Sequence, residues 1–263
     1  LDNILFTPNG KLHRTLTSLA FKNLLHPFQP FIIGQKTIGP LFASKFNIPL
    51  IFYGENQAEY GNPTEENSSA KMDEKFFSKS NKEEIVLSGE PISKIMNDYD
   101  YKLSDFQHYI PTDIDDLKEK NIEQRYLGYY LKWDPQECFY YAAKHTGFRP
   151  NSERTEGTFS KYSGIDDKID TFHYYLTFIK FGIGRATYDA CQEIRNDKIT
   201  RDEGINLIKK FDSEFPKKYF NDFLEYIDIS EENFFETVDK FRSPHLWKKI
   251  NGEWSLNKQV FNY

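Results

Sequence analysis

Apolar residues in the first sixty positions follow strand-like and helix-like patterns in turn. Residues 1–7 (LDNILFT) contain a short apolar run that the turn signal at 8–10 (PNG) stops, which predicts a strand. Apolar residues at helical spacing then predict helices over 12–25 and 35–46. Residues 48–53 (IPLIFY) form an unbroken apolar run, typical of a strand covered on both faces. This succession predicts an α/β fold with a parallel sheet.

The middle of the chain has a weaker pattern. Residues 61–84 are rich in Asn, Ser, Glu and Lys, and we expect them to form an exposed excursion. Weak helices are predicted between 85 and 124, with breaks at Pro91 and Pro111.

The last part of the chain is predicted to be mainly helical. Thr200 and Glu203 form a capping box before an apolar-periodic segment. Ser230 is placed to cap a helix that runs through Phe241, and Ser243-Pro244 supplies an N-cap and a first-turn proline for a further helix. The expected fold class is therefore α/β, with a parallel-sheet part followed by a mainly helical C-terminal region.

Composition and charge narrow the class of protein. Aromatic residues make up 17% of the chain, which indicates a folded protein, and no apolar stretch approaches the ~20 residues of a membrane span. The net charge of −6 argues against a general nucleic-acid binder, which needs a basic surface. Cys138 and Cys191 form no CxxC pair, so neither a zinc ribbon nor a disulfide framework is expected, and the cytoplasm is the expected compartment.

The most informative local feature is the segment 54–61 (GENQAEYG), directly after the predicted buried strand. In an open parallel sheet, ligands bind beyond the carboxyl ends of the strands. Gly54 would let the backbone approach a phosphate, and Glu55 and Glu59 could hold Mg²⁺ or orient a nucleotide. The alternative is a surface loop with two solvated glutamates, and the pattern leaves both open.

Gln35 and Lys36 stand at the predicted start of the second helix. A helix N-terminus offers free N–H groups and the positive end of the helix dipole, so an anion could bind there beside Lys36. In the alternative, Gln35 caps the helix and Lys36 extends into solvent.

A second polar cluster occupies residues 156–170 (EGTFSKYSGIDDKID), where hydroxyl groups, a lysine and three carboxylates precede a helix. Lys161, Asp166 and Asp167 could clamp phosphates or a sugar. Equally, Asp166 and Asp167 could be first-turn charges that the helix dipole favours.

Arg185, Asp189 and Glu193 follow at intervals of four and share one helical face. Such a stripe is usually a solvated ladder of ion pairs. It follows the glycines of 182–184 (GIG), where a backbone could approach another group closely.

Aromatic residues and histidines add little to the candidate site. Trp133 and residues 139–141 (FYY) could stack on a sugar ring, although core packing is the default for aromatics at this density. The six histidines have no HxxxH or HxH spacing, so a metal site built on them is not expected.

The chain resembles the N-acetyl sugar amidotransferase family along nearly its whole length. The resemblance is carried, in order, by PFQPFIIGQK, IPLIFYGENQAEYG, GYYLKWDPQE, TEGTFSKYSGIDDKIDTFHYYLTFIKFGIGRATYDACQEIR and SPHLWKK. That family is similar to the PP-loop ATP pyrophosphatases, which carry an SGGxDS-type loop after their first strand. No such loop occurs here, and the first residue is Leu1, so we expect an N-terminally truncated chain.

The resemblance implies a division of the chain into three parts. Residues 1–61 would be the C-terminal part of a PP-loop ATP pyrophosphatase-like domain. Residues 62–125 would be a charged, variable insertion, and residues 126–263 a mainly helical region that binds substrate or a partner.

The resemblance also implies a reaction. ATP, with Mg²⁺, would adenylate the carbonyl oxygen of an N-acetyl group on a nucleotide-linked sugar. Ammonia would then displace AMP to leave an acetamidino group. A separate glutamine amidotransferase subunit would supply the ammonia. The pathways implied are bacterial lipopolysaccharide biosynthesis and flagellin glycosylation with nonulosonic (pseudaminic or legionaminic) acids.

By matching motif, the resemblance assigns roles to the candidate residues. Nucleotide and Mg²⁺ would face Gly54, Glu55 and Glu59, beside Gln35 and Lys36. The catalytic group would consist of Lys161, Asp166, Asp167 and Arg185.

Two other readings remain open on the sequence. One is another PP-loop ligase, such as a tRNA-modifying enzyme, which would predict a basic patch and cysteine pairs. The other is a non-catalytic truncated module that binds a sugar nucleotide or docks a glutaminase.

Overall fold

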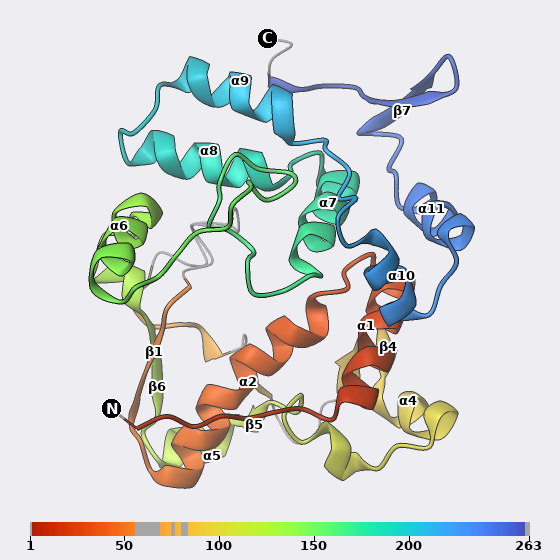
Figure 1. Cartoon of the computed structure of the whole chain (residues 1–263). Coiled ribbons are helices and arrows are strands. Elements are labelled where there is room, and N and C mark those ends of the chain that lie inside the picture. Colours follow the sequence, from red (N-terminus) through yellow and green to blue (C-terminus); the bar gives the residue numbers. More distant parts are fainter. Residues whose placement is uncertain (1, 56–68, 75–76, 80–83, 261–263) are drawn as a thin grey trace. The chain divides into compact units, whose positions relative to one another are not determined.

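The computed structural model describes residues 2–55, 69–74, 77–79 and 84–260. The chain divides into two compact units, residues 1–132 and 133–263. The first unit mixes helices with short parallel strands and the second is mainly helical (Figure 1). The predicted fold class is therefore confirmed, whereas the three-part division at 61 and 125 stays a prediction.

The first unit begins with two helices and contains short strands and turns. Its helices are α1 (Gly10–Leu24), α2 (Gln29–Phe46), α4 (Ile92–Tyr99) and α5 (Ile114–Glu119), with 3-10 turns η3 (Leu103–Phe106) and η4 (Leu127–Tyr129). Its strands are β1 (Leu50–Tyr53), β2 (Ser78–Lys79), β3 (Val86–Leu87), β4 (Glu90–Pro91), β5 (Thr112–Asp113) and β6 (Glu123–Tyr126).

Strand β1 pairs in parallel with β6, from Leu50 opposite Glu123 to Tyr53 opposite Tyr126. Ile51 and Tyr53 pack on the buried cluster formed by Ala43, Met72, Phe77, Leu117, Ile122 and Tyr126. Leu50 and Phe52, which point to the other face, are 44% and 51% exposed. The predicted strand is confirmed, but its coverage on both faces is wrong, because its apolar residues at alternate positions face solvent rather than a second layer.

The strand predicted over residues 1–7 is wrong. Residues 2–9 have no regular secondary structure, and Leu5 is 89% exposed. An apolar run becomes a strand only where a partner edge completes its hydrogen bonds, and no strand in the described part of the chain pairs with this segment. The turn signal after it does mark a boundary, because Asn9 caps α1 by accepting a hydrogen bond from the Lys11 backbone N–H at 3.1 Å.

Helix α2 begins six residues earlier than the predicted start at Gln35. Pro30 lies in its first turn, where a proline loses no helical hydrogen bond, so the helix can begin before this residue. Gln35 and Lys36 consequently lie inside the helix and not at its N-terminus.

The middle of the chain is partly as predicted. Helices α4 and α5 confirm the weak helices, and Pro91 stands at the N-cap of α4. Met72 and Phe77 are 0% and 2% exposed, so these described residues of the predicted excursion belong to the core. Residues 61–68, 75–76 and 80–83 of that segment lie outside the described residues.

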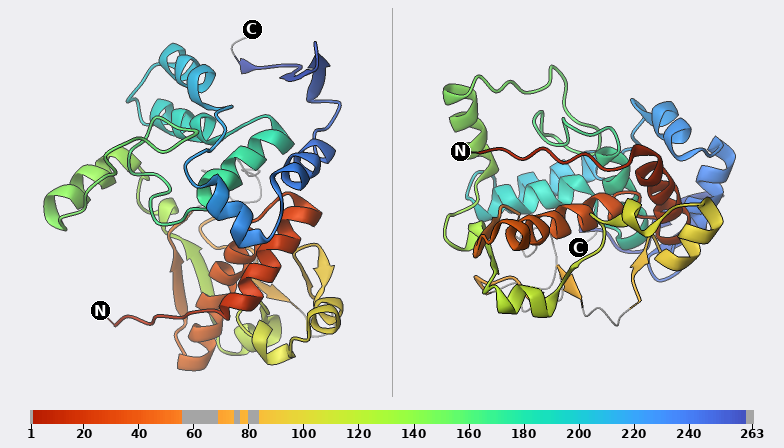
Figure 2. Two further views of the ribbon diagram at one scale, coloured as in Figure 1. Left: turned by 45° about the vertical axis from the view of Figure 1, so that its right-hand side comes forward. Right: turned by 90° about the horizontal axis from the view of Figure 1, so that it is seen from below.

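The second unit contains six described helices and a terminal hairpin. The helices are α6 (Pro135–His145), α7 (Asp170–Phe181), α8 (Arg185–Arg195), α9 (Arg201–Phe211), α10 (Phe220–Ile227) and α11 (Glu231–Lys240), and the strands are β7 (Trp247–Ile250) and β8 (Glu253–Leu256). Both predicted caps are confirmed: Thr200 and Glu203 form a capping box on α9, and Ser230 caps α11. Helices α8 and α9 pack side by side, as Figure 1 and the turned views of Figure 2 show.

The helix predicted from Ser243 is wrong, because a β-hairpin follows. Strands β7 and β8 pair antiparallel around Asn251 and Gly252, whose φ angles are 52° and 89°. An Asn-Gly pair favours the two-residue turn that needs positive φ at both positions. The indole N–H of Trp247 donates to the Ile179 carbonyl at 2.7 Å, which fixes the hairpin to α7.

Candidate functional site

In the first unit, four predicted residues lie together at the carboxyl end of β1. The Tyr53 hydroxyl donates to Gln35 Oε1 at 2.8 Å, which ties the middle of α2 to the end of the strand. Gly54 and Glu55 follow the strand directly. Burial lowers the pKa of Lys36, and the charge of Glu55 opposes that shift, so these two side chains interact.

Gln35 and Lys36 lie near the end of β1, as predicted, but they do not stand at a helix N-terminus. Gln35 and Lys36 reach the strand end as side chains from inside α2, so the predicted anion site on a helix N-terminus is not formed there. Tyr53 is the member that the sequence did not single out. Glu59 lies outside the described residues.

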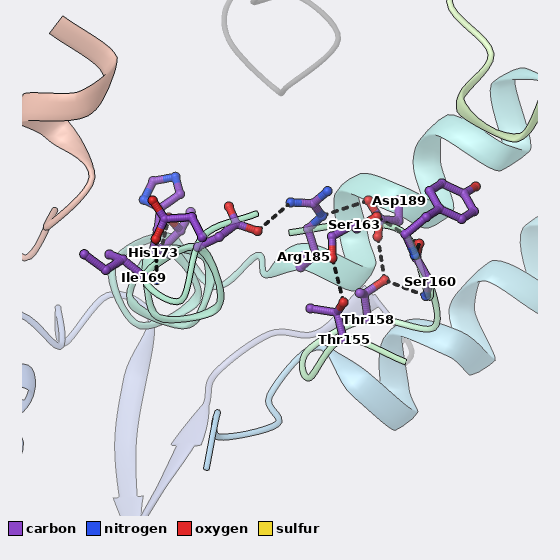
Figure 3. Close-up of polar contacts among 12 residues, drawn as sticks. Thr155, Thr158, Ser160, Ser163, Ile169, His173, Arg185 and Asp189 are labelled. Carbon is purple, nitrogen blue, oxygen red and sulfur yellow. Dashed lines mark hydrogen bonds and ion pairs between the residues drawn. The ribbon is translucent and has the colours of Figure 1, made fainter. Parts of the chain in front are cut away.

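In the second unit, Arg185 connects two helices. Its Nε donates to Asp189 Oδ1 at 3.0 Å within α8, and its Nη1 lies 3.5 Å from Asp170 Oδ2 at the start of α7 (Figure 3). The guanidinium lies over the Tyr174 ring, 4.3 Å from the centroid. Burial works against the cation, but Asp189, Tyr174 and Asp170 outweigh it and raise the pKa of Arg185.

Burial disfavours the charged form of Asp170 in this ion pair. Burial raises the pKa of its carboxyl to about 6, because Arg185 offsets only part of the desolvation and Asp167 and Asp166 add negative charge nearby. Gly164 permits the close approach, because the Cβ of any other residue there would overlap Asp170 Oδ2.

A line of hydroxyl groups continues from Asp189 into the loop before α7. The buried Thr158 hydroxyl donates to Asp189 Oδ2 at 2.5 Å, and Thr158 Oγ1 accepts from the Ser160 N–H at 3.4 Å. The Ser163 hydroxyl bonds to Ser160 Oγ at 2.9 Å, and the Thr155 hydroxyl donates to the Ser163 carbonyl at 2.6 Å (Figure 3). The loop has no helix or strand, and these side-chain bonds hold it together with backbone bonds such as that from the Thr155 N–H to the Ser160 carbonyl at 2.9 Å.

This loop also carries the other predicted catalytic residues, Lys161, Asp166 and Asp167. Among the described residues, Arg185 pairs with Asp170 and Asp189 and not with these three. Lys161 is exposed, and its ammonium donates to the Ser152 carbonyl at 3.0 Å. Asp167 Oδ1 accepts from the Ile169 N–H at 2.7 Å, while Asp166 is exposed. Helix α7 begins only at Asp170, so Asp166 and Asp167 precede it and are not charges of its first turn.

The stripe of Arg185, Asp189 and Glu193 is not a solvated ladder. The side chains of Arg185 and Asp189 are 17% and 18% exposed, and Glu193 is 9% exposed. The helical spacing was correct, but sequence alone could not show that the loop of Thr158 covers this face of α8.

Sequence reasoning missed the group that fixes the start of α8. Asp212, at the C-cap of α9, accepts from the Gly184 N–H at 2.9 Å and from the Thr187 N–H and hydroxyl, each at 2.8 Å. The close approach expected at the glycines of 182–184 is real, and its partner is this carboxylate. Only the packing of α9 on α8 brings the two together.

The exposed aromatic residues depart from the default of core packing. Tyr140 and Tyr141 on α6 are 57% and 67% exposed, and no residue of that helix is buried. Cys138 and Cys191 are both free and exposed.

Metal and membrane sites receive no support from the described residues. Among them, no three His, Cys, Asp or Glu side chains are grouped to hold a metal ion. The Mg²⁺ site predicted at Glu55 and Glu59 stays a prediction, because one of its two ligands is not described. No helix in the described ranges combines the length and apolarity required to span a bilayer.

Comparison with known protein families gives a match within the second unit. Residues 156–260 match the family described as "LPS biosynthesis protein WbpG-like, C-terminal domain". No curated protein matches the chain closely enough to count as a relative. The matched range begins in the hydroxyl-rich loop and includes Arg185, Asp189 and the helices that hold them. This part of the chain is therefore similar to the C-terminal domain of a protein of lipopolysaccharide biosynthesis.

Proposed function

We propose that the chain belongs to an ATP-dependent amidotransferase that converts the N-acetyl group of a sugar, supplied on a nucleotide, into an acetamidino group. ATP is consumed to adenylate the amide oxygen, and ammonia then replaces the AMP. The setting is the biosynthesis of a bacterial surface polysaccharide or flagellin glycan. The single observation that carries the proposal is the match of residues 156–260 to a domain of lipopolysaccharide biosynthesis.

The polar groups of the two units suit different parts of this reaction. Lys36 and Gln35, beside the end of β1, offer a cation and an amide to the phosphates of ATP. The carboxylates of Asp170 and Asp189, with the hydroxyl-rich loop, offer hydrogen-bond acceptors and donors to a sugar. In this proposal Arg185 holds the two carboxylates in place and offsets their mutual repulsion.

Activation is needed because an amide oxygen is a poor leaving group. Once it is converted to a phosphate ester, ammonia can attack the amide carbon, and AMP departs with the oxygen. Cationic groups near the phosphates stabilise the charge that develops there. A glutaminase subunit is the proposed source of ammonia, and Mg²⁺ is the proposed counterion of ATP.

The test is an assay with ATP, Mg²⁺, ammonium and a panel of UDP- and CMP-linked N-acetyl sugars. It uses this chain and a version extended upstream in the parent gene, where the SGGxDS-type loop is expected. Mass spectrometry would detect AMP, pyrophosphate and a product one mass unit lighter than its substrate, as replacing O by NH requires.

The outcomes separate the competing functions. A lighter product from either version supports the proposal. If neither version releases AMP with any sugar, the amidotransferase function is refuted. Binding of a sugar nucleotide without turnover would then support the non-catalytic module.

A further inference from the structure

The sequence contains an asparagine followed by a glycine at two places, residues 9–10 and 251–252. Both asparagines and both glycines are exposed to solvent. A Cβ built on either glycine meets no atom within 4 Å, so there is open space beside both backbones. The two pairs are therefore alike in sequence and in exposure, and only their hydrogen bonds and backbone conformations distinguish them.

An Asn-Gly pair can lose the side-chain amide of its asparagine through an intramolecular reaction. The glycine nitrogen attacks the asparagine Cγ and forms a C–N bond, and the amide nitrogen leaves as ammonia with the proton of the glycine N–H. Water then opens the resulting succinimide ring, which leaves an aspartate or an isoaspartate. Glycine favours the reaction because it has no side chain to obstruct the nitrogen and because its backbone adopts a wide range of conformations.

The structure holds Asn9 in a conformation that opposes this attack. Its Oδ1 accepts from the Lys11 N–H at 3.1 Å and from the Leu12 N–H at 3.4 Å, as the N-cap of α1. Gly10 is the first residue of that helix. The side chain of Asn9 must leave the cap before its Cγ can meet the Gly10 nitrogen, so the reaction requires the stabilisation of the cap to be lost.

Asn251 has no such restraint. Among the residues that the structure describes, no hydrogen bond holds the Asn251 side chain or the Gly252 N–H. The pairing of Ile250 with Glu253 closes the turn, and the φ angle of Asn251 is 52°. A left-handed backbone is less favourable than an extended one for a residue with a Cβ, so the turn does not hold Asn251 as the cap holds Asn9.

We propose that Asn251 is a site of spontaneous deamidation and that the resulting change stays confined to the tip of the β7–β8 hairpin. Water is the co-reactant, and ammonia is the leaving group. The inference does not depend on the proposed function, because it requires neither ATP nor a sugar.

Confinement to the tip follows from the way the hairpin is anchored. The indole N–H of Trp247, at the start of β7, donates to the Ile179 carbonyl at 2.7 Å. Just after β8, the Asn257 N–H donates to the Leu246 carbonyl at 2.8 Å. Both bonds lie at the end of the hairpin away from the turn, so they can persist when the turn changes.

The modification changes the shape and the charge of the tip. An isoaspartate lengthens the backbone by one carbon, which disturbs the pairing of Ile250 with Glu253 next to it. Residues 247–256 carry two lysines and one glutamate, so a new carboxylate cancels the net positive charge of the hairpin.

The test follows both pairs in one sample. Wild-type protein is incubated in mildly alkaline buffer and digested, and mass spectrometry measures the gain of one mass unit at positions 9 and 251. A parallel sample in urea, where both pairs are unfolded, gives the intrinsic rate of each. We expect the folded rate relative to the urea rate to be about five-fold or more higher at 251 than at 9, since a cap worth ~1 kcal/mol corresponds to that factor.

Three results would overturn the assignment of Asn251. The first is an equal relative rate at the two positions, or a higher one at position 9. The second is a folded protein in which position 251 keeps its amide while both positions react in urea. The third comes from Asn251→Gln, whose longer side chain would have to close a larger ring: we expect no mass gain in the hairpin and an unchanged rate at position 9, and a persistent gain would place the reaction at another residue.

Hydrogen exchange tests whether the change stays at the tip. The modified and unmodified fractions differ in charge and can be separated by ion exchange. We expect amide exchange over residues 250–253 to be faster in the modified fraction, while exchange in α7 is the same in both. Faster exchange in α7 as well would show that the modification releases the Trp247 anchor, which would refute the confinement.

Discussion

The Gly184 N–H donates to Asp212 Oδ2 at 2.9 Å, and this contact joins the start of α8 to the end of α9. A Cβ at position 184 would lie 2.6 Å from the Asp212 carbonyl oxygen, which is closer than real contacts allow. The φ angle of −111° suits any residue, so the glycine is required for space and not for its backbone conformation.

We therefore expect Gly184→Ala to destabilise the second unit by ~1–3 kcal/mol, the usual cost of forcing an extra carbon into a packed site. Urea unfolding followed by circular dichroism would measure the change. Gly10→Ala is the control, because a Cβ there meets no atom within 4 Å and alanine favours a helix. A Gly184→Ala protein as stable as the wild type would show that α8 and α9 can separate without cost.

The Thr158 hydroxyl should stabilise the loop that covers α8. Thr158→Val keeps the shape of the side chain but leaves Asp189 without its hydroxyl donor, so we expect a loss of ~1–2 kcal/mol in unfolding free energy. Thr146→Val removes an exposed hydroxyl that donates to the Ala142 carbonyl, and it should cost ~0.5 kcal/mol or less. Chemical denaturation would compare the two, and equal losses would contradict the assigned role of Thr158.

Asp170 should make stability depend on pH in acid. Because its pKa in the folded state is about 6, against 3.8 for an ordinary aspartate, the folded protein holds a proton there that the unfolded chain has released. Its stabilising contribution is complete below about pH 4 and is lost as the pH rises through about 6.

The variant Asp170→Asn should flatten this fall in stability, measured as unfolding free energy at intervals between pH 4 and 7. Glu236→Gln removes an exposed charge on α11 that is not among the charges acting on Asp170, and it serves as the control. An unchanged slope in Asp170→Asn would mean that Arg185 compensates the burial fully.

The Tyr53–Gln35 hydrogen bond offers a test of the first unit. If Gln35 and Lys36 contact ATP, Tyr53→Phe should raise the ATP concentration needed for half-maximal AMP release, because Gln35 loses the donor that orients it. Tyr101→Phe is the matched control, since it removes a hydroxyl that bonds to Thr15 Oγ1 at 3.0 Å. Each variant should lose about 1 kcal/mol of stability, and equal ATP dependence in the two would argue against a nucleotide at this end of β1.

The sequence by itself determined the elements whose signals are local. The Thr200–Glu203 capping box, the Ser230 cap, the helix after Asn9 and the strand over residues 50–53 could all be predicted, because each depends on neighbouring residues. The terminal hairpin also had a local signal in Asn251-Gly252, which the Ser-Pro pair before it obscured.

Tertiary structure decided which of these signals matter and which groups meet. Residues 1–7 have a strand-like pattern but no described partner strand. Burial of the stripe on α8 and the contact of Asp212 with Gly184 depend on segments far apart in sequence. Desolvation and long-range hydrogen bonds act between such segments only after the chain has folded, so no local pattern could specify them.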